Sequence, residues 1–418
     1  MAKDLIHEIS RLRERDVVWQ TGQCFGYVYD PGPEALGLMQ QAFLEYSSVT
    51  VLDTQAFPSA KVLEDRVSSF AKQILKAPHG SGSSFTTGGT ESIFLSVLAH
   101  REWARAEKGV KHPNLVLSDT AHPAFVKACF YLGVTPIIVS AGSDYRADSK
   151  SVEYHVDKDT IALVASAPAY GTGQVDPIKE MGLLAEAENI GLIIDACVGG
   201  GILPFIESPI EVSFRQPGVT AITLDWHKWF MSIKGASSVV YRDQKMLEYQ
   251  TFAHSAWMGY PIVNPTITST RSAGHLAATA LILDYFGIEG YRKVAIEILE
   301  ASETVKRFLR ASNELELVGD PPLNVFSFKS RSPNINVYRL QARLREKGWF
   351  VQPQTSFGDM PESCHISVSR GNIPRIEDFL GVLESTLTED LGGPLDIESI
   401  NLMPIKKRDA YLKRQRVG

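Results

Sequence analysis

Short runs of apolar residues alternate with longer segments of helical periodicity through the middle of the chain. Six runs have the length and composition of buried strands, at 115–118, 136–140, 162–168, 191–196, 221–225 and 237–241. Segments with apolar residues at helical spacing lie before and between them, at 61–77, 90–108, 122–132 and 178–189. This alternation predicts an α/β fold with a mostly parallel sheet and helices on both faces.

The pattern changes after residue 290. A long helical segment over 291–312 precedes strand–helix–strand signals and one further helix, which predicts a small α+β domain. A length of 418 residues also suits one large domain plus a smaller one. We therefore expect an N-terminal arm, a large domain, a small C-terminal domain and a basic tail, over 1–60, 61–290, 291–392 and 393–418.

Composition and charge exclude several classes of protein. The net charge of -6 leaves no basic face for nucleic acid. No apolar run reaches the roughly 20 residues that span a bilayer, and the N-terminus has no apolar signal core. The chain has four dispersed cysteines and no CxxC pair: Cys24, Cys129, Cys197 and Cys364. This pattern argues against a zinc site or a disulfide framework and favours a reducing compartment. We expect a cytoplasmic protein.

The segment TTGGTES at 86–92 stands before a predicted helix. Its glycines let the backbone approach a ligand closely, and the helix start presents free N–H groups. Together with the hydroxyl of Thr90, this arrangement suits a dianionic phosphate. A tight turn capped by threonine explains the same residues equally well. The segment is not a P-loop, because no Gly-Lys-Ser/Thr follows.

Two predicted strands end in charged residues. Asp195 ends the strand in GLIIDACVGG, at the edge of a parallel sheet where ligands bind, although capping the next helix is an alternative role. In LDWHKWF, His227 and Lys228 follow another strand directly. The flanking aromatic residues would desolvate Lys228, lower its pKa and free the amine to attack a carbonyl. A surface lysine in a loop is the alternative.

These features in one α/β domain match the needs of pyridoxal 5'-phosphate (PLP). That cofactor requires an anion site, a partner for its pyridine nitrogen and an amine for its aldehyde. His122, which follows a further predicted strand, can stack on the pyridine ring, although a helix cap is the simpler role for this residue alone. The sequence therefore predicts a PLP enzyme.

Five ordered segments resemble a known family: TTGGTESIFLSVLAHREWARAEKG, TAHPAFVKACFYLGV, IIDACVGGGILPF, DWHKWFMSIKGASSVVY and NPTITSTRSAGH. They are similar to the sphingosine-1-phosphate lyase branch of the group II PLP-dependent decarboxylase family, from about Gly26 to about Tyr291. The resemblance implies fold type I, with a large domain around a mostly parallel seven-stranded sheet plus a small C-terminal α+β domain. It also implies a homodimer with a shared active site.

The resemblance assigns cofactor contacts to matching residues. Lys228 would carry the cofactor as a Schiff base, Asp195 would pair with the pyridine nitrogen, and His122 would stack on the ring. The cofactor phosphate would be held by Gly89, Thr90 and His227. Thr270 would reach the same phosphate from the second subunit.

The resemblance also assigns substrate contacts. Lys234 matches a lysine that the lyases use for substrate phosphate and proton transfer, and Tyr29 matches a substrate-binding tyrosine. In SVTVLDTQAFP, Thr50 and Asp53 stand where the lyases carry Asn and His against the substrate phosphate. An aspartate at that place would repel a phosphate unless a cation intervenes.

Two reactions fit the predicted site. In the first, a β-hydroxy amine loses an aldehyde by retro-aldol cleavage, with Lys234 or a histidine as base. In the second, an α-amino acid loses carbon dioxide, and Arg370 would anchor its carboxylate unless it forms only a surface ion pair. The overall resemblance favours the first reaction, whereas the altered phosphate end and the WHKW sequence favour the second. A third hypothesis, a non-catalytic PLP-fold protein, conflicts with the joint presence of Lys228, Asp195, His122 and Thr90.

Overall fold

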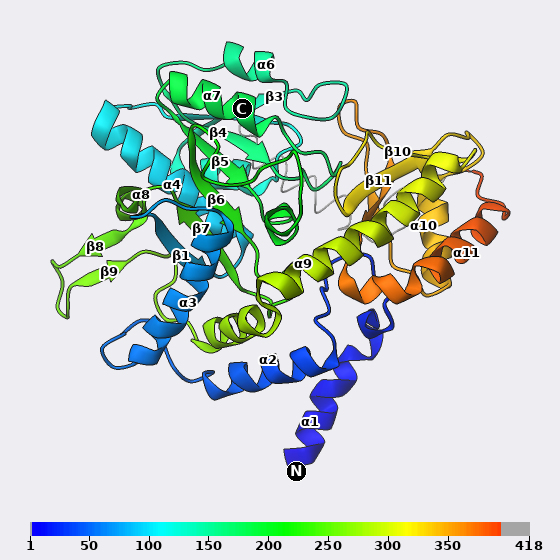
Figure 1. Cartoon of the computed structure of the whole chain (residues 1–418), viewed down its shortest axis with the longest axis horizontal. Coiled ribbons are helices and arrows are strands. Elements are labelled where there is room, and N and C mark those ends of the chain that lie inside the picture. Colours follow the sequence, from blue (N-terminus) through cyan, green and yellow to red (C-terminus); the bar gives the residue numbers. More distant parts are fainter. Residues whose placement is uncertain (1, 394–418) are drawn as a thin grey trace.

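A seven-stranded sheet forms the centre of the larger part of the molecule (Figure 1). The computed structural model describes residues 2–393, so the predicted basic tail lies outside the described residues from residue 394 onward. The strand order is β1-β7-β6-β5-β4-β2-β3. Their bounds are β1 (Gly82–Thr86), β2 (Asn114–Ser118), β3 (Thr135–Val139), β4 (Thr160–Ser166), β5 (Gly191–Asp195), β6 (Val219–Leu224) and β7 (Ser237–Tyr241).

The sheet is mostly parallel, as predicted. Strands β2 to β6 pair in parallel, while β7 is antiparallel to both β6 and β1. The six predicted strands are all present, with small shifts at their ends. Strand β1 was not among the predicted strands, because its short polar residues give no apolar run and only pairing with β7 makes them a strand.

Helices cover both faces of this sheet. Neighbouring residues of β5 show the division: Ile193 belongs to a core beneath α4 and α5, and Ile194 belongs to the core on the opposite face. The helices of the large part are α3 (Pro58–Ile74), α4 (Gly89–Lys108), α5 (Ala124–Leu132), α6 (Ser149–Tyr154), α7 (Ile178–Ala187) and α8 (Gln244–Gln250). Within residues 2–393, no helix combines the length and apolar character needed to cross a bilayer.

A smaller antiparallel sheet lies beside the large one, and the predicted α+β unit is confirmed. Its order is β10-β11-β13-β12, and α10 (Val337–Glu346) and α11 (Ile376–Leu387) pack with it. The strands are β10 (Leu315–Leu317), β11 (Val325–Ser330), β12 (Gln352–Gln354) and β13 (Ser363–Ser367). Helix α9 (Gly274–Ala311) joins the two parts and begins well before the predicted residue 291. The sequence pattern misses its first half because Gly287, with φ 57°, interrupts the helical backbone.

Two further elements stand away from the body of the molecule (Figure 1). Helix α1 (Ala2–Arg11) projects from it at the N-terminus, and a hairpin of β8 (Phe252–His254) and β9 (Ile262–Asn264) projects beside the large sheet. Between α1 and α3, helix α2 (Pro33–Glu45) packs along α9. Short 3-10 turns complete the chain at Leu12–Arg15, Trp19–Thr21, Gly199–Gly201, Leu203–Phe205 and Arg370–Arg375.

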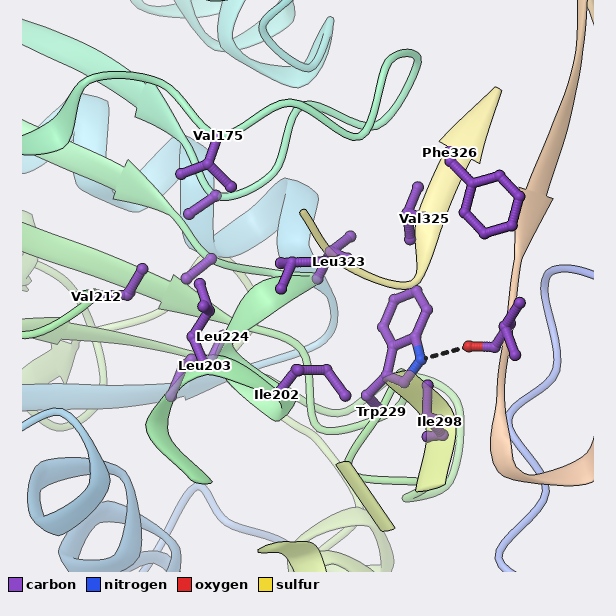
Figure 2. Close-up of a cluster of buried hydrophobic side chains, with 14 of the residues drawn as sticks. Val175, Ile202, Leu203, Val212, Leu224, Trp229, Ile298, Leu323, Val325 and Phe326 are labelled. Atoms are coloured by element: carbon purple, nitrogen blue, oxygen red, sulfur yellow. Dashed lines mark hydrogen bonds between the residues drawn. The ribbon is translucent and has the colours of Figure 1, made fainter. Parts of the chain in front are cut away.

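Trp229 ties the loop after β6 to the small sheet. Its indole N–H donates a hydrogen bond of 2.9 Å to the carbonyl oxygen of Val368, and its ring lies near Leu323 and Val325 (Figure 2). Only 1% of Trp229 is exposed, so its ring fills the space between the loop after β6 and the small sheet. The residue directly before it, Lys228, is thereby held at the junction of the two parts of the molecule.

Candidate active site

A cavity of about 710 Å³ opens at the carboxyl edge of the large sheet. The parallel strands direct their following residues to this edge, where ligands bind in sheets of this kind. Strand β5 contributes its last residue. The other lining residues come from the start of α4, the loops after β2, β4, β5 and β6, the segment before α2 and strand β12. Eight of the residues predicted from the sequence line the cavity: Tyr29, Gly89, Thr90, His122, Asp195, His227, Lys228 and Lys234.

The start of α4 forms one end of the cavity. The first N–H groups of a helix have no acceptor within it, so they are available to an anion. A Cβ atom at Gly89 would lie 2.8 Å from Asp225 Oδ1 and 2.9 Å from Cys197 Sγ, so only glycine fits there. Thr90 is exposed toward the cavity. This end therefore has the shape and the donors that a phosphate requires.

A buried carboxylate holds this loop in place. Glu91 accepts hydrogen bonds of 2.7 Å from both the backbone N–H and the hydroxyl of Thr87. Its other oxygen accepts from the backbone N–H of Ile267 at 2.9 Å. Glu91 thus connects the anion-binding loop to the segment that leads to Thr270.

Lys228 forms an ion pair with a carboxylate that the sequence argument overlooked. Its Nζ lies 2.9 Å from Oδ2 of Asp225, which is 3% exposed. Burial lowers the pKa of Lys228, but the attraction of Asp225 and of nearby groups outweighs it and raises the pKa above its ordinary value. The expectation of a lowered pKa was therefore wrong, because it considered desolvation without this partner. The hydroxyl of Ser237 donates to Asp225 and helps to fix it.

Asp195 and His122 are each held by local hydrogen bonds. Asp195 Oδ1 accepts from the backbone N–H of Cys197 at 3.1 Å and from the hydroxyl of Thr223 at 3.2 Å. Nδ1 of His122 accepts from the N–H of Ala124 at 3.2 Å, so the ring caps α5 while it lines the cavity. Burial lowers the pKa of His122, against the attraction of Asp195, which favours a neutral ring suited to stacking.

Lys234 is a second amine in the same cavity. Its Nζ donates to the carbonyl oxygen of His227 at 3.0 Å and lies 4.7 Å from the centroid of the Tyr29 ring. Although the residue is exposed at the mouth of the cavity, desolvation by the surrounding protein, followed by repulsion from Lys228, lowers the pKa of Lys234 to about 8. A substantial fraction of this amine is therefore neutral near pH 8. The Tyr29 ring also packs 4.6 Å from that of Trp229, and burial raises the pKa of its hydroxyl.

His227 has a defined orientation. Its Nδ1 lies 2.8 Å from the carbonyl oxygen of Ala236, and a carbonyl only accepts, so Nδ1 carries the proton. Nε2 lies 3.8 Å from Oδ2 of Asp225. Burial lowers the pKa of His227, partly offset by Asp225, so its ring is favoured in the neutral form.

Four predicted residues lie outside the lining of this cavity. Thr50 and Thr270 belong to two segments that run side by side, since the N–H of Val51 donates to the carbonyl of Arg271 at 3.0 Å. Asp53 is exposed and accepts from the backbone just before α3. Arg370 lies against Gly32, where a Cβ atom would come within 2.6 Å of its Nη1. The roles of these four stay predictions.

The groups around the cavity fit PLP. An amine at Lys228, a carboxylate at Asp195, a flat neutral ring at His122 and a helix start at Gly89 meet the four requirements of that cofactor. They come from four separate segments of the chain. The fold and this cavity define the class as PLP-dependent lyases of fold type I.

The chain belongs to the pyridoxal-dependent decarboxylase family, whose conserved domain matches residues 4–331. It is 31% identical over 391 residues to the sphingosine-1-phosphate lyase of Arabidopsis thaliana, covering 90% of this chain and 70% of the relative. It is 32% identical to sphingosine-1-phosphate lyase 1 of Rattus norvegicus, covering 88% and 64%. The solved sphingosine-1-phosphate lyase of Burkholderia pseudomallei superposes with a TM-score of 0.89 at 28% identity, covering 99% of this chain and 94% of that one.

Replacing Lys228 by alanine should remove the amine that bonds to PLP. We expect Lys228→Ala to lose the visible absorbance of a lysine Schiff base and all measurable turnover, because the other amine, Lys234, is held by the carbonyl of His227. Absorbance spectra and borohydride trapping followed by peptide mass spectrometry would locate the bond. Lys234→Ala is the matched control and should keep the absorbance. A Lys228→Ala protein with full activity would refute the assignment.

Proposed function

We propose that this protein cleaves a carbon–carbon bond in a β-hydroxy amine and releases an aldehyde and a shorter amine. PLP held in this cavity would supply an electron sink for the bond that breaks, once the substrate amine has taken the place of Lys228. The broken bond joins the amine-bearing carbon to the hydroxyl-bearing carbon, and the hydroxyl must lose its proton as the aldehyde forms. Phosphorylated long-chain amines are the first candidates, because the relatives described above are named for sphingosine-1-phosphate.

Lys234 is the observation that carries this proposal. A retro-aldol cleavage needs a base beside the cofactor, and an amine with a pKa near 8 can take and return a proton at ordinary pH. Lys234 also becomes a cation when it accepts that proton, which suits a nearby phosphate. The Tyr29 ring at 4.7 Å limits where Nζ can move. Lys234 would thus accept the hydroxyl proton and later return it to the amine-bearing carbon.

Decarboxylation of an α-amino acid is the second candidate. Asp53 favours it, since a carboxylate replaces a residue that the lyases use against a phosphate. Its weakness is the carboxylate anchor, because the candidate Arg370 contacts Gly32 outside the cavity lining. The third hypothesis, a non-catalytic protein, conflicts with membership of a family of PLP-dependent lyases.

The products distinguish the two reactions. PLP-loaded protein would be given phosphorylated and unphosphorylated β-hydroxy amines together with common α-amino acids, and the products analysed by mass spectrometry. We expect an aldehyde and a shortened amine, with greater yield from phosphorylated substrates. An amine lighter by one carbon dioxide, with no aldehyde, would establish decarboxylation instead.

The pH profile should report on Lys234. If its neutral form takes the hydroxyl proton, kcat/KM, which reports on the free enzyme, rises with pH and levels off above about 8, where this amine has lost its proton. Lys234→Arg stays protonated and should lose this rise along with roughly 10²- to 10⁴-fold in kcat. Lys61→Arg, the same change at an exposed lysine, is the control. An unchanged profile in Lys234→Arg would show that another group is the base.

We also propose a homodimer in which each subunit completes the cavity of the other. Helix α1 and the 3-10 turn after it expose four large apolar side chains, a feature typical of interaction surfaces: Leu5, Ile6, Ile9 and Leu12. The β8–β9 hairpin and the segment after it also expose large apolar side chains, among them Trp257, Met258, Val263 and Ile267. Thr270 follows these residues and would enter the partner's cavity.

Mixing two inactive variants tests this arrangement. A heterodimer of Lys228→Ala and Thr270→Ala subunits would have one cavity with both residues intact, so activity should return when the two are refolded together. Activity would be measured at limiting PLP, where loss of a phosphate contact worth about 1–3 kcal/mol is visible. No recovery, in a mixture shown by mass photometry to contain heterodimers, would place Thr270 in its own subunit's site.

A cytoplasmic location is a further proposal. It is supported by the four cysteines, each of which is buried and free among the described residues. Free thiols persist in reducing compartments.

A further inference from the structure

A second cavity, of about 740 Å³, lies next to the active-site cavity. It is bounded on one side by loops of the large sheet and on the other by β12 and the turn that follows it. The apolar part of its lining comes from both sides: Pro123, Ala141, Tyr145, Pro353, Phe357 and Met360. The turn at Phe357 and Met360 is held by two backbone hydrogen bonds between these residues.

The two cavities share a wall. Tyr170 and Gln352 line the active-site cavity, while their chain neighbours Gly171 and Pro353 line the second one. The hydroxyl of Tyr170 donates a hydrogen bond of 2.6 Å to Oε1 of Gln352, so the wall joins the large sheet to the small one. The Tyr170 ring also packs 4.3 Å from that of His365, which holds it from the side of the small sheet.

We propose that the second cavity is the subsite for the part of the substrate beyond the cleaved bond, with the Tyr170–Gln352 pair as the partition that this part must pass. This inference rests on the proposed function, since it takes the substrate to be an amine that extends from Lys228. A volume of 740 Å³ is enough for an alkyl chain or an aromatic group. Opening the partition breaks one hydrogen bond between side chains, which costs little compared with the apolar area that a long chain buries.

The charges of the second cavity specify what it accepts. Asp119 and Asp359 are the charged residues of its lining. Asp119 is fixed in place, since its Oδ1 accepts from the backbone N–H of Ala141 at 3.0 Å. Two carboxylates would repel an anionic chain, whereas the active-site cavity offers an anion Lys234 and the start of α4, since Lys228 is paired with Asp225. The subsite should therefore take an uncharged aliphatic or aromatic chain, while any phosphate stays on the lysine side.

Filling the second cavity tests the proposal. Gly171 lines it, and a Cβ atom there would meet only Gln354 Nε2, at 3.7 Å, so a larger side chain can extend into the cavity. Gly171→Phe would be compared with Gly381→Phe, a matched change at an exposed position of α11 with nothing within 4 Å of its Cβ. The probes are 1-amino-2-alkanols of increasing chain length, whose chain extends from the hydroxyl-bearing carbon, and the readout is Kd by titration calorimetry on PLP-loaded protein.

We expect the native protein and Gly171→Phe to bind the shortest amino alcohol alike. In the native protein and in Gly381→Phe, Kd should fall about fourfold for each further methylene that is buried, until the cavity is full. In Gly171→Phe this dependence on length should vanish. The same length dependence in Gly171→Phe as in the native protein would overturn the proposal, as would a native protein whose Kd does not change with chain length.

A charge change provides a second test that does not depend on the fold of Gly171→Phe. Asp359 is exposed on the turn, so Asp359→Lys should fold normally. Long amino alcohols that end in a carboxylate should bind the native protein at least tenfold more weakly than their methyl-ended equivalents, and Asp359→Lys should remove most of this difference. No difference between the two probes in the native protein would contradict the proposal. Because these are binding measurements, they stand even if product analysis shows decarboxylation in place of retro-aldol cleavage.

Discussion

The buried ion pair between Lys228 and Asp225 is the constraint around which the active site is arranged. A charged lysine that is held away from water needs a partner of opposite charge. Asp225, the residue directly after β6, supplies one at 2.9 Å. The pair explains why Gly89 must lack a side chain, since a Cβ atom there would press on Asp225. It also explains the opposite pKa shifts of the two lysines. Attraction to Asp225 raises the pKa of Lys228, whereas desolvation and repulsion from Lys228 lower the pKa of Lys234.

Two amines with opposite pKa shifts in one cavity suit a reaction with separate covalent and proton-transfer roles. In the proposed reaction, Lys228 would bond to the cofactor and Lys234 would exchange a proton near pH 8. Pairs of titratable groups whose environments shift their pKa values in opposite directions are common where one group acts as the acid and the other as the base. The lowered pKa of Lys234 also means that a bound phosphate would draw it back toward the charged form.

The small sheet contributes to the site through contacts that cross between the two parts of the molecule. Trp229 donates to Val368, directly beside Lys228, and Tyr170 donates to Gln352 at the wall of the cavity. A movement of the small sheet would therefore reach both the cofactor lysine and the partition to the second cavity.

The local sequence pattern was sufficient to predict the parallel strands, because strand length and apolar runs are local properties. It also predicted which residues would come together, because parallel strands all have their carboxyl ends at the same edge of the sheet. Lys228, Asp195 and His122 were found in this way, Gly89 was found from the glycine-rich start of a predicted helix, and all four line one cavity. Only the tertiary structure decided the rest. Strand β1 exists through its pairing with β7, the charge state of Lys228 depends on how close Asp225 lies, and Tyr170 meets Gln352 across 182 residues of chain. Such contacts depend on how distant segments pack, and no local pattern encodes that packing.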